Sequence, residues 1–211
     1  MLTDREGERP SPEERSAVRV ILASGAWLEH DAGWLRREEA DRALAALRDE
    51  LLWEQREIVI FGRPILQPRL IAWAGDFGYR YSGQTLEPRA FTPTMSGLLD
   101  RVRTECGVPF NHVLANRYRS GDDSMGLHAD DEPELGRDPV VAIVSLGASR
   151  RLVIKPRRAQ DRQRHDQTLS HGALLVMGGT FQRHYVHGVP RQAATSGERI
   201  SLTFRRLLRA P

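Results

Sequence analysis

The sequence predicts a mainly β protein of the α+β class, built as a double-sheet fold such as a jelly roll, with two helices packed on one outer face. Two observations lead to this class. The first half of the chain holds two helical patterns, and short segments rich in β-forming residues fill most of the rest, separated by Gly, Pro, Asp or Ser. The chain has 211 residues, 40% of them hydrophobic, which is enough for one sizeable core. We therefore expect one domain, residues 18–211.

The composition narrows the setting in which this domain works. Residues 1–17 are rich in Glu, Arg, Pro and Ser, offer little apolar surface to bury and are expected to be flexible. A charged amino terminus and the lack of any run of about eighteen apolar residues argue against a secretory signal and a membrane span. The single cysteine, Cys106, fits a reducing compartment and a core position better than a nucleophile. A soluble, cytoplasmic protein without a membrane partner is expected.

Two amphipathic helices are expected to serve as scaffold. The first covers residues 36–55, where apolar side chains recur at helical spacing: Ala40, Leu44, Leu47, Leu51 and Leu52. The second covers residues 94–106, with Pro93 near its first turn and Gly107 as its stop. Its buried face is formed by Leu98, Leu99 and Val102.

The strands are expected in short segments of β-branched and aromatic residues. They cover residues 58–61, 71–73, 112–118, 140–146, 151–154, 173–177, 184–189 and 199–207. Neither a repeat nor a second domain is indicated.

The basic residues are almost all arginine, since lysine occurs once, at Lys155, and the net charge is a mild +3. Their placement carries more information than their number. Between residues 150 and 164, seven basic side chains face a single acid: Arg150, Arg151, Lys155, Arg157, Arg158, Arg162 and Arg164 against Asp161. A basic block of this kind is typical of segments that contact nucleic-acid phosphates, although a solvated polar loop would have the same composition.

His128 and Asp130 lie two positions apart in an extended segment, so their side chains project to the same side and can share one metal ion. Two histidines and one carboxylate with vacant positions form the site of non-haem Fe(II) oxygenases. Taken alone, His-x-Asp is a weak signal, and a surface histidine beside solvated acids is the simpler interpretation.

The third ligand is sought in a later strand that holds His184 and His187. In a strand these two side chains point to opposite faces, so at most one of them faces the metal. We take His187 as the candidate and interpret His184 as a solvent-facing or core-edge histidine.

The final strand presents two different faces. Ile200, Leu202 and Phe204 alternate with a polar set, Arg199, Ser201, Thr203 and Arg205. The polar set would be an ordinary solvated face in an edge strand. However, Arg199 and Arg205 lie roughly 20 Å apart along a strand, and their side chains could lean inward to grip both carboxylates of a small diacid beside the metal.

The strand before His128 places Asn116 and Tyr118 on the same face as Leu114. An amide and a phenol in the interior need polar partners. A bound 2-oxoglutarate would be such a partner, and bonds to the backbone would satisfy the two groups equally well.

Together these segments resemble the AlkB family of Fe(II)- and 2-oxoglutarate-dependent nucleic-acid dealkylating dioxygenases, most of all its duplex-DNA-acting members. The resemblance covers about residues 58–208 in the right order and is carried by Asn116-Arg117-Tyr118, His128-Ala129-Asp130-Asp131-Glu132, His187-Gly188-Val189-Pro190 and Arg199-x-x-Leu202-Thr203-Phe204-Arg205. It implies a double-stranded β-helix catalytic core at residues 111–208 and a helical, nucleotide-recognising part at residues 18–110.

The resemblance also implies roles for single residues. His128, Asp130 and His187 would bind Fe(II). Arg199 and Arg205 would hold the carboxylates of 2-oxoglutarate, with Asn116 and Tyr118 as hydrogen-bond partners. Ser201 stands where many members have Asn, which puts one bond to 2-oxoglutarate in doubt. With dioxygen as the second co-substrate, such an enzyme hydroxylates an N-methyl carbon of a base and releases formaldehyde.

The family reaches its target base by flipping it out of the duplex. Tyr79 and Tyr81 resemble the aromatic segment that covers the flipped base, with His128 on its other side. Two tyrosines on a half-buried strand are the alternative. Asp131 and Glu132 resemble acids that meet the edge of the cationic base or orient an arginine, for which Arg69 is the candidate.

Two further segments resemble parts that contact the duplex. Val59-Ile60-Phe61-Gly62-Arg63 resembles the hydrophobic finger that fills the gap left by the flipped nucleotide, with Phe61 at its centre. Arg157 and Arg158 resemble the loop that contacts backbone phosphates. A buried strand with a turn and a solvated loop are the respective alternatives.

The function expected from the sequence is oxidative demethylation of N-alkylated DNA bases such as 1-methyladenine and 3-methylcytosine. Duplex DNA is the favoured substrate, with single-stranded DNA and RNA left open. A second hypothesis keeps the iron site but directs it to RNA, protein or lipid. A third is a metal-containing nucleic-acid binding module without turnover, against which the paired arginines argue, because a pure binder needs no diacid clamp.

Overall fold

The computed structural model describes residues 17–60, 62–81, 84–158, 164–195 and 197–208. The segment predicted to be flexible, apart from Ala17, and the predicted finger residue Phe61 lie outside these ranges. In the described part of the chain, none of the helices has the length and apolar content that crossing a membrane requires.

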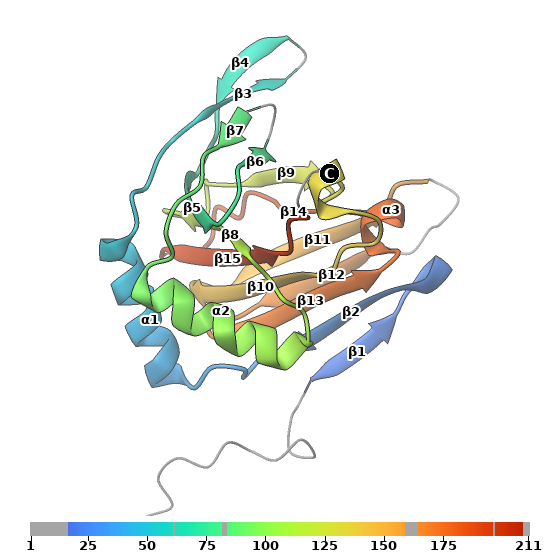
Figure 1. Ribbon diagram of the computed structural model, residues 1–211, viewed down its shortest axis with the longest axis horizontal. Coiled ribbons are helices and arrows are strands. Elements are labelled where there is room, and N and C mark those ends of the chain that lie inside the picture. The colour runs from blue at the N-terminus through green and yellow to red at the C-terminus, as the bar shows by residue number, and fades with distance from the viewer. Residues whose placement is uncertain (1–16, 61, 82–83, 159–163, 196, 209–211) are drawn as a thin grey trace, which may run out of the picture.

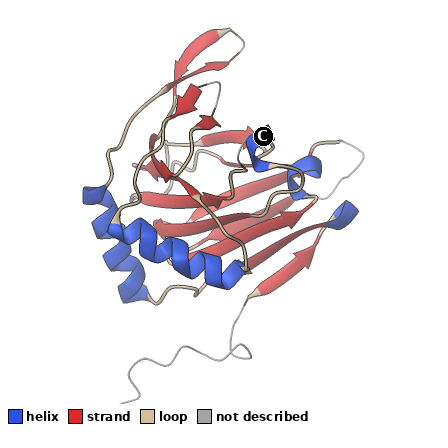
Figure 2. Ribbon diagram, viewed as in Figure 1, coloured by secondary structure: helices blue, strands red, loops and turns tan. Residues whose placement is uncertain are grey.

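Two antiparallel sheets form the body of the protein (Figures 1 and 2). The large sheet has the strand order β1-β2-β13-β10-β15-β8-β5. Its strands are β1 (Val18–Ile21), β2 (Ala26–Asp31), β5 (Leu70–Gly75), β8 (His112–Tyr118), β10 (Val141–Gly147), β13 (Ala173–Gly179) and β15 (Arg199–Arg205). Because β1, β2 and β5 precede residue 111 and the other four follow it, the two parts expected on either side of residue 110 share one sheet.

The small sheet has the order β12-β11-β14-β9 and faces the large one. Its strands are β9 (Met125–His128), β11 (Arg150–Pro156), β12 (His165–Leu169) and β14 (Tyr185–Val189). Apolar side chains of both sheets meet between them, including Ile143 and Met177 from the large sheet and Leu152 and Ile154 from the small one. This is the double-sheet arrangement that the sequence predicts.

The two predicted helices cover the outer face of the large sheet, where α1 (Arg37–Glu50) and α2 (Pro93–Cys106) pack on a core that includes Val113, Val144 and Leu202 (Figure 1). Thr92 caps α2 by accepting the Met95 N–H, and Gly107 ends it with φ of 64°.

The first helix is shorter than predicted. It ends at Glu50 because Leu51 adopts an extended conformation, and Leu52, predicted in the buried stripe, is 76% exposed.

Smaller elements lie at the edges of this sandwich. The hairpin β3 (Glu57–Ile60) and β4 (Arg63–Leu66) turns at Gly62 and projects from the body, beside the hairpin β6 (Tyr79–Tyr81) and β7 (Gln84–Leu86) (Figure 1). The short helix α3 (Phe181–His184) precedes β14, and two 3-10 turns, η2 (Ala23–Gly25) and η3 (Pro133–Leu135), complete the fold. The predicted strand at residues 184–189 therefore begins one residue later, and His184 belongs to a helix.

Candidate active site

The two candidate histidines lie side by side on neighbouring strands. His128 is the last residue of β9 and is paired in register with His187 of β14, and their ring centroids are 4.4 Å apart. A bulge between His187 and Val189 interrupts the pairing. A side chain at Gly188 would lie 2.8 Å from the carbonyl oxygens of both Met125 and Gly126. Glycine at this position therefore permits the close approach that brings the imidazoles together.

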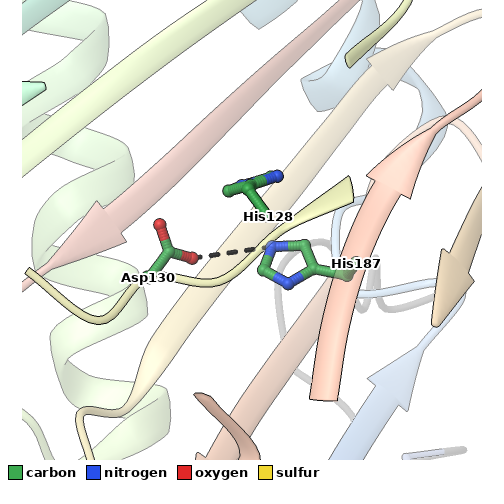
Figure 3. A group of neighbouring side chains, drawn as sticks. All are labelled: His128, Asp130 and His187. Atoms are coloured by element: carbon green, nitrogen blue, oxygen red, sulfur yellow. Dashed lines mark ion pairs between the residues drawn. The ribbon is translucent and has the colours of Figure 1, made fainter. Parts of the chain in front are cut away.

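Asp130 joins the histidines from the loop after β9 (Figure 3). Its backbone N–H donates to Oε1 of the buried Gln182 at 3.0 Å, which fixes the loop against α3. Its Oδ2 lies 3.5 Å from Nε2 of His187. One ligand atom from each of His128, Asp130 and His187 lies within 4.8 Å of the other two.

This geometry fits a single metal ion. Nitrogen and oxygen ligands bound at about 2.0–2.2 Å from one ion lie within about 4.4 Å of each other, close to the separation found here. Nδ1 of His128 lies 3.1 Å from the Gly126 carbonyl oxygen, a bond that holds the proton on Nδ1 and leaves Nε2 for a metal.

The protonation states also suit metal binding. Burial, together with the neighbouring His128, lowers the pKa of His187 to about 3, and burial lowers the pKa of His128. Burial alone would raise the pKa of Asp130, but Arg205 and the two histidines hold it at about 2. At neutral pH the site thus offers two neutral imidazoles and a carboxylate, which are the forms that bind metal.

Arg205 forms an ion pair with the candidate metal ligand Asp130, which the sequence does not indicate. Its Nε and Nη2 donate to Oδ1 of Asp130 at 3.0 and 2.5 Å. The pair is fully buried, and the Nη1 group of Arg205 has no hydrogen-bond partner among the described residues. Arg205 therefore orients the carboxylate and has one donor left for a further anion.

Arg199 occupies the other end of the same strand face. Its Nε donates to Oγ of Ser145 at 2.9 Å, its Cζ lies 5.2 Å from the Tyr118 ring centroid, and its buried Nη1 has no partner in the described ranges. Together with Arg205 this makes two buried guanidinium groups with an unused donor each.

A small cavity connects these arginines with the histidines. It is lined by Asn116, Tyr118, Met125, His128, Ile143, Leu152, His187, Gly188, Val189, Arg199, Ser201, Thr203 and Arg205. All four residues of the predicted polar face of the last strand are in this set, while Ile200, Leu202 and Phe204 lie in the core beneath the helices. Two free guanidinium donors beside a metal-binding triad fit a dicarboxylate that also reaches the metal.

Two residues at this site carry a sequence signal too weak to be recognised. Ser145 is the one hydroxyl in the apolar strand β10 and accepts from Arg199. Gln182 has no distinguishing pattern, since only the turn of α3 directs it at Asp130.

Several residues predicted to contact the substrate have other neighbours than the sequence suggests. Arg69 is buried and donates to Oδ1 of Asn116 at 2.8 Å and to the Ser124 carbonyl at 3.3 Å. Asp131, one of the two acids expected to meet the base or to orient Arg69, is exposed and paired with Arg157. The pair joins the loop after β11 to the segment that carries Asp130. Arg158 beside it is exposed.

Tyr79 does not have the free ring face that a lid over a base requires. It is fully buried, its ring centroid lies 4.7 Å from that of His112, and Cζ of Arg205 lies 5.6 Å from the ring centroid. Its hydroxyl lies near the half-buried Glu132, and burial raises the pKa of Tyr79 well above its usual value. The side chain of Tyr81, the other predicted lid residue, lies outside the described part of the structure.

A sandwich of antiparallel sheets with a His-Asp-His triad and a pair of buried arginines has the parts that a metal- and diacid-dependent oxygenase requires. The chain belongs to the 2OG-Fe(II) oxygenase superfamily, whose family model matches residues 28–205. The name of this superfamily gives Fe(II) and 2-oxoglutarate, and the triad and the two buried arginines offer the groups that would hold them.

Within the superfamily the chain is similar to AlkB homologues. It is 36% identical over 182 residues to alpha-ketoglutarate-dependent dioxygenase alkB homolog 3 of Homo sapiens, covering 82% of this chain and 63% of that protein. It is 35% identical over 185 residues to DNA oxidative demethylase ALKBH2 of Mus musculus, covering 82% and 77%. The chain thus spans about three fifths of the human alkB homolog 3.

The fold has a counterpart among solved structures. The structure of OsALKBH1 superposes with a TM-score of 0.62 at 17% identity, covering 90% of this chain and 100% of the other. This likeness confirms the predicted jelly-roll fold.

Proposed function

We propose that this enzyme oxidatively removes alkyl groups from N-alkylated bases of DNA, such as 1-methyladenine and 3-methylcytosine. The observation that carries the proposal is the convergence of His128, Asp130 and His187 with Arg199 and Arg205 at one buried site. The similarity to a relative named DNA oxidative demethylase supports the choice of substrate.

Each residue at the site has a defined task in this reaction. His128, Asp130 and His187 hold Fe(II), and Arg199 and Arg205 receive the carboxylates of 2-oxoglutarate. When bound, iron and 2-oxoglutarate supply with dioxygen the oxidant that hydroxylates the N-methyl carbon, after which the base loses formaldehyde. The buried arginines neutralise the diacid, and the surrounding apolar wall excludes water.

Of the two acids after Asp130, Glu132 is the better placed to meet the base. Asp131 points outward to Arg157, whereas Glu132 is half-buried beside Tyr79 and is electrostatically coupled to Asp130 and Arg205. A methylated base is cationic, so a carboxylate at its edge stabilises it. Arg157 and Arg158, both exposed, remain our candidates for phosphate contacts.

The test of this proposal is formaldehyde release from oligonucleotides that carry one 1-methyladenine or 3-methylcytosine, with Fe(II), ascorbate and 2-oxoglutarate. We expect release by the wild type and its loss in His128→Ala and Asp130→Ala. Both variants should be checked for folding by circular dichroism. Unchanged methylated oligonucleotides, with 2-oxoglutarate decarboxylated in the presence of another substrate, would point to RNA, protein or lipid instead.

We further propose that duplex DNA is the preferred form of the substrate. The hairpin β3–β4 supports this, because it projects from the body and exposes Ile65 and Leu66, apolar residues suited to an unstacked base step (Figure 1). Ile65→Ser combined with Leu66→Ser should lower activity on a duplex lesion and spare a single-stranded one. Equal loss on both, measured at the same salt concentration, would contradict a duplex-specific role of the hairpin.

A further inference from the structure

Arg150 is not part of the exposed basic block in which the sequence places it. It is the first residue of β11 and is 1% exposed, while its neighbour Arg151 faces solvent and pairs with Asp166. Arginine is rarely fully buried, because removing its charge from water is strongly unfavourable unless hydrogen-bond partners replace the water.

The partners of Arg150 are oxygen atoms of two loops. Nη1 donates to the Ser120 carbonyl at 3.0 Å, and Nη2 donates to the carbonyls of Asp123 and Pro190, each at 2.8 Å. Nε donates to Oε1 of Gln192 at a longer 3.4 Å. One guanidinium thus joins the loop before β9 to the loop after β14.

These two loops are directly connected to the strands that carry the two histidines. Ser120 and Asp123 lie before β9, which ends at His128, and Pro190 directly follows β14, which holds His187. The pairing of β9 with β14 has two registered positions, His187 with His128 and Val189 with Met125, with a bulge between them. So short and irregular a ladder fixes the separation of the strands weakly. Backbone bonds of Gly121 with Gln192 and Thr195 also join the two loops, and Arg150 adds a buried side-chain connection to them.

Arg150 also contacts the diacid side of the site. Its Cζ lies 5.3 Å from the ring centroid of Tyr118, and Cζ of Arg199 lies 5.2 Å from the same centroid. Two guanidinium groups therefore hold one phenol ring, and a change at Arg150 reaches Arg199 through Tyr118.

We propose that Arg150 is a positioning residue that sets the spacing of His128 and His187 and the orientation of Tyr118 and Arg199. This inference rests on the proposed assignment of those residues to Fe(II) and 2-oxoglutarate. Only arginine suits the position, because its planar fork reaches three carbonyls in fixed directions, whereas a lysine ammonium is a single point with a flexible stem.

The test compares Arg150→Lys and Arg150→Ala with Arg151→Ala, the adjacent residue on the same strand that faces solvent. Without oxygen, Fe(II) is titrated into each protein in the presence of excess 2-oxoglutarate, and 2-oxoglutarate is titrated into each Fe(II)-loaded protein. Both titrations are followed by the visible charge-transfer band of the complex. We expect Arg150→Ala to weaken binding of both about tenfold, as loss of groups that orient ligands does. Arg150→Lys should be intermediate, and Arg151→Ala should match the wild type.

A merely structural role gives a different result. In that case Arg150→Lys and Arg150→Ala would have lower melting temperatures but, when assayed well below them, wild-type affinity for both ligands, and the proposal would be wrong. Should Arg150→Ala fail to fold, Arg150→Lys and Gln192→Ala decide by the same criterion.

The assay contains no nucleic acid, so its outcome is separate from that of the proposed dealkylation. Intact binding without dealkylation would overturn the proposed function and leave Arg150 in its role. A wild type that binds neither Fe(II) nor 2-oxoglutarate would overturn the assignment of the site and this inference with it.

Discussion

His112 is a buried histidine with no evident hydrogen bond. It is fully buried on the same face of β8 as Asn116 and Tyr118, and neither ring nitrogen has a hydrogen-bond partner among the described residues. A side chain at Gly75, its partner in β5, would lie 2.8 Å from His112 Cδ2, so the glycine makes room for the ring. Burial, with a smaller effect from Arg205, lowers the pKa of His112 from 6.5 to about 3.

This pKa predicts an acid-sensitive fold. Because the folded state binds the proton more weakly than the unfolded chain, the stability is fully present above pH 6.5 and is lost as the pH falls toward 3. Between about pH 7 and about pH 5, His112 should account for a loss of about 2 kcal/mol in unfolding free energy. His112→Leu should reduce the pH dependence by that amount in urea unfolding of the metal-free protein.

The control for this prediction is His184→Leu, a histidine on the short helix α3 that is only partly buried. It should leave the pH dependence close to that of the wild type. Identical pH dependence in His112→Leu and the wild type would show that His112 is protonated as readily in the folded protein as in the unfolded chain.

At the level of single residues, the sequence indicates a role where chemistry and spacing are both distinctive. His128, Asp130 and His187 do converge, and Arg199, Ser201, Thr203 and Arg205 do line one cavity. His187 joins this group and His184 does not, and the physical reason differs from the predicted one, since His184 is helical rather than on the opposite face of a strand. The Asp130–Arg205 pair and the Asp131–Arg157 pair depend on loop conformation, which strand alternation does not determine.

At the level of elements, the site depends on the close approach of β9 to β14. Gly126 and Gly188 are both on these strands, yet a Cβ at Gly126 would meet nothing within 4 Å, while one at Gly188 would collide with two carbonyl oxygens. The collision is with backbone, so it can be relieved only by moving one strand away from the other.

We therefore predict that Gly188→Ala separates His128 from His187 and weakens Fe(II) binding by about tenfold or more, since metal sites respond steeply to the placement of their ligands. The measurement is an anaerobic Fe(II) titration with 2-oxoglutarate present. Gly126→Ala is the matched control and should bind as the wild type does. Equal effects of the two substitutions would contradict the steric argument.

Element boundaries were predicted best where local and tertiary signals agree. The strand at residues 112–118 has the predicted limits and the second helix ends at Cys106 as predicted, because turn residues and a glycine cap mark these positions. The edge strand β1 and the strand β12 were not predicted. Most of β1 is exposed, and β12 alternates in burial with polar side chains such as Asp166 and Gln167, so neither has an apolar run. Both are held by pairing with a neighbour.

At the level of the whole molecule, the site concentrates buried charge between the two sheets. Arg199 and Arg205 are each 1% exposed, and Asp130 is the carboxylate paired with Arg205. Buried cations without full compensation reduce stability, and a bound dianion would supply the missing acceptors.

Binding of 2-oxoglutarate should therefore stabilise the entire fold. With Mn(II) in place of Fe(II) to prevent turnover, a concentration of about 100 times the dissociation constant adds about 2.7 kcal/mol, which for a domain of this size is a rise of about 5–10 °C in melting temperature. Differential scanning fluorimetry would measure it. Pyruvate, which has one carboxylate, should give a smaller rise, and Arg199→Gln should remove the difference between the two acids.

The overall fold class was predictable because it follows from the number and spacing of the strands, and the relation to OsALKBH1 agrees with it. The predicted division of the domain into two parts at residue 110 does not describe how the strands pair, because both parts contribute strands to the large sheet. Strand β2 pairs with β13, as in Ala26 with Gly179, and β5 pairs with β8, as in Leu70 with Arg117. Pairing over such distances is not visible in local sequence patterns.

The position of β15 has a consequence for how the enzyme is made. This strand comes last among the described elements, yet it lies in the interior of the large sheet between β10 and β8. During synthesis, β8 and β10 leave the ribosome before the strand that separates them. Their places in the native sheet are therefore completed only when residues 199–205 are released. Because the same strand carries Arg199 and Arg205, the cavity that they line with His128 and His187 cannot form before the core closes.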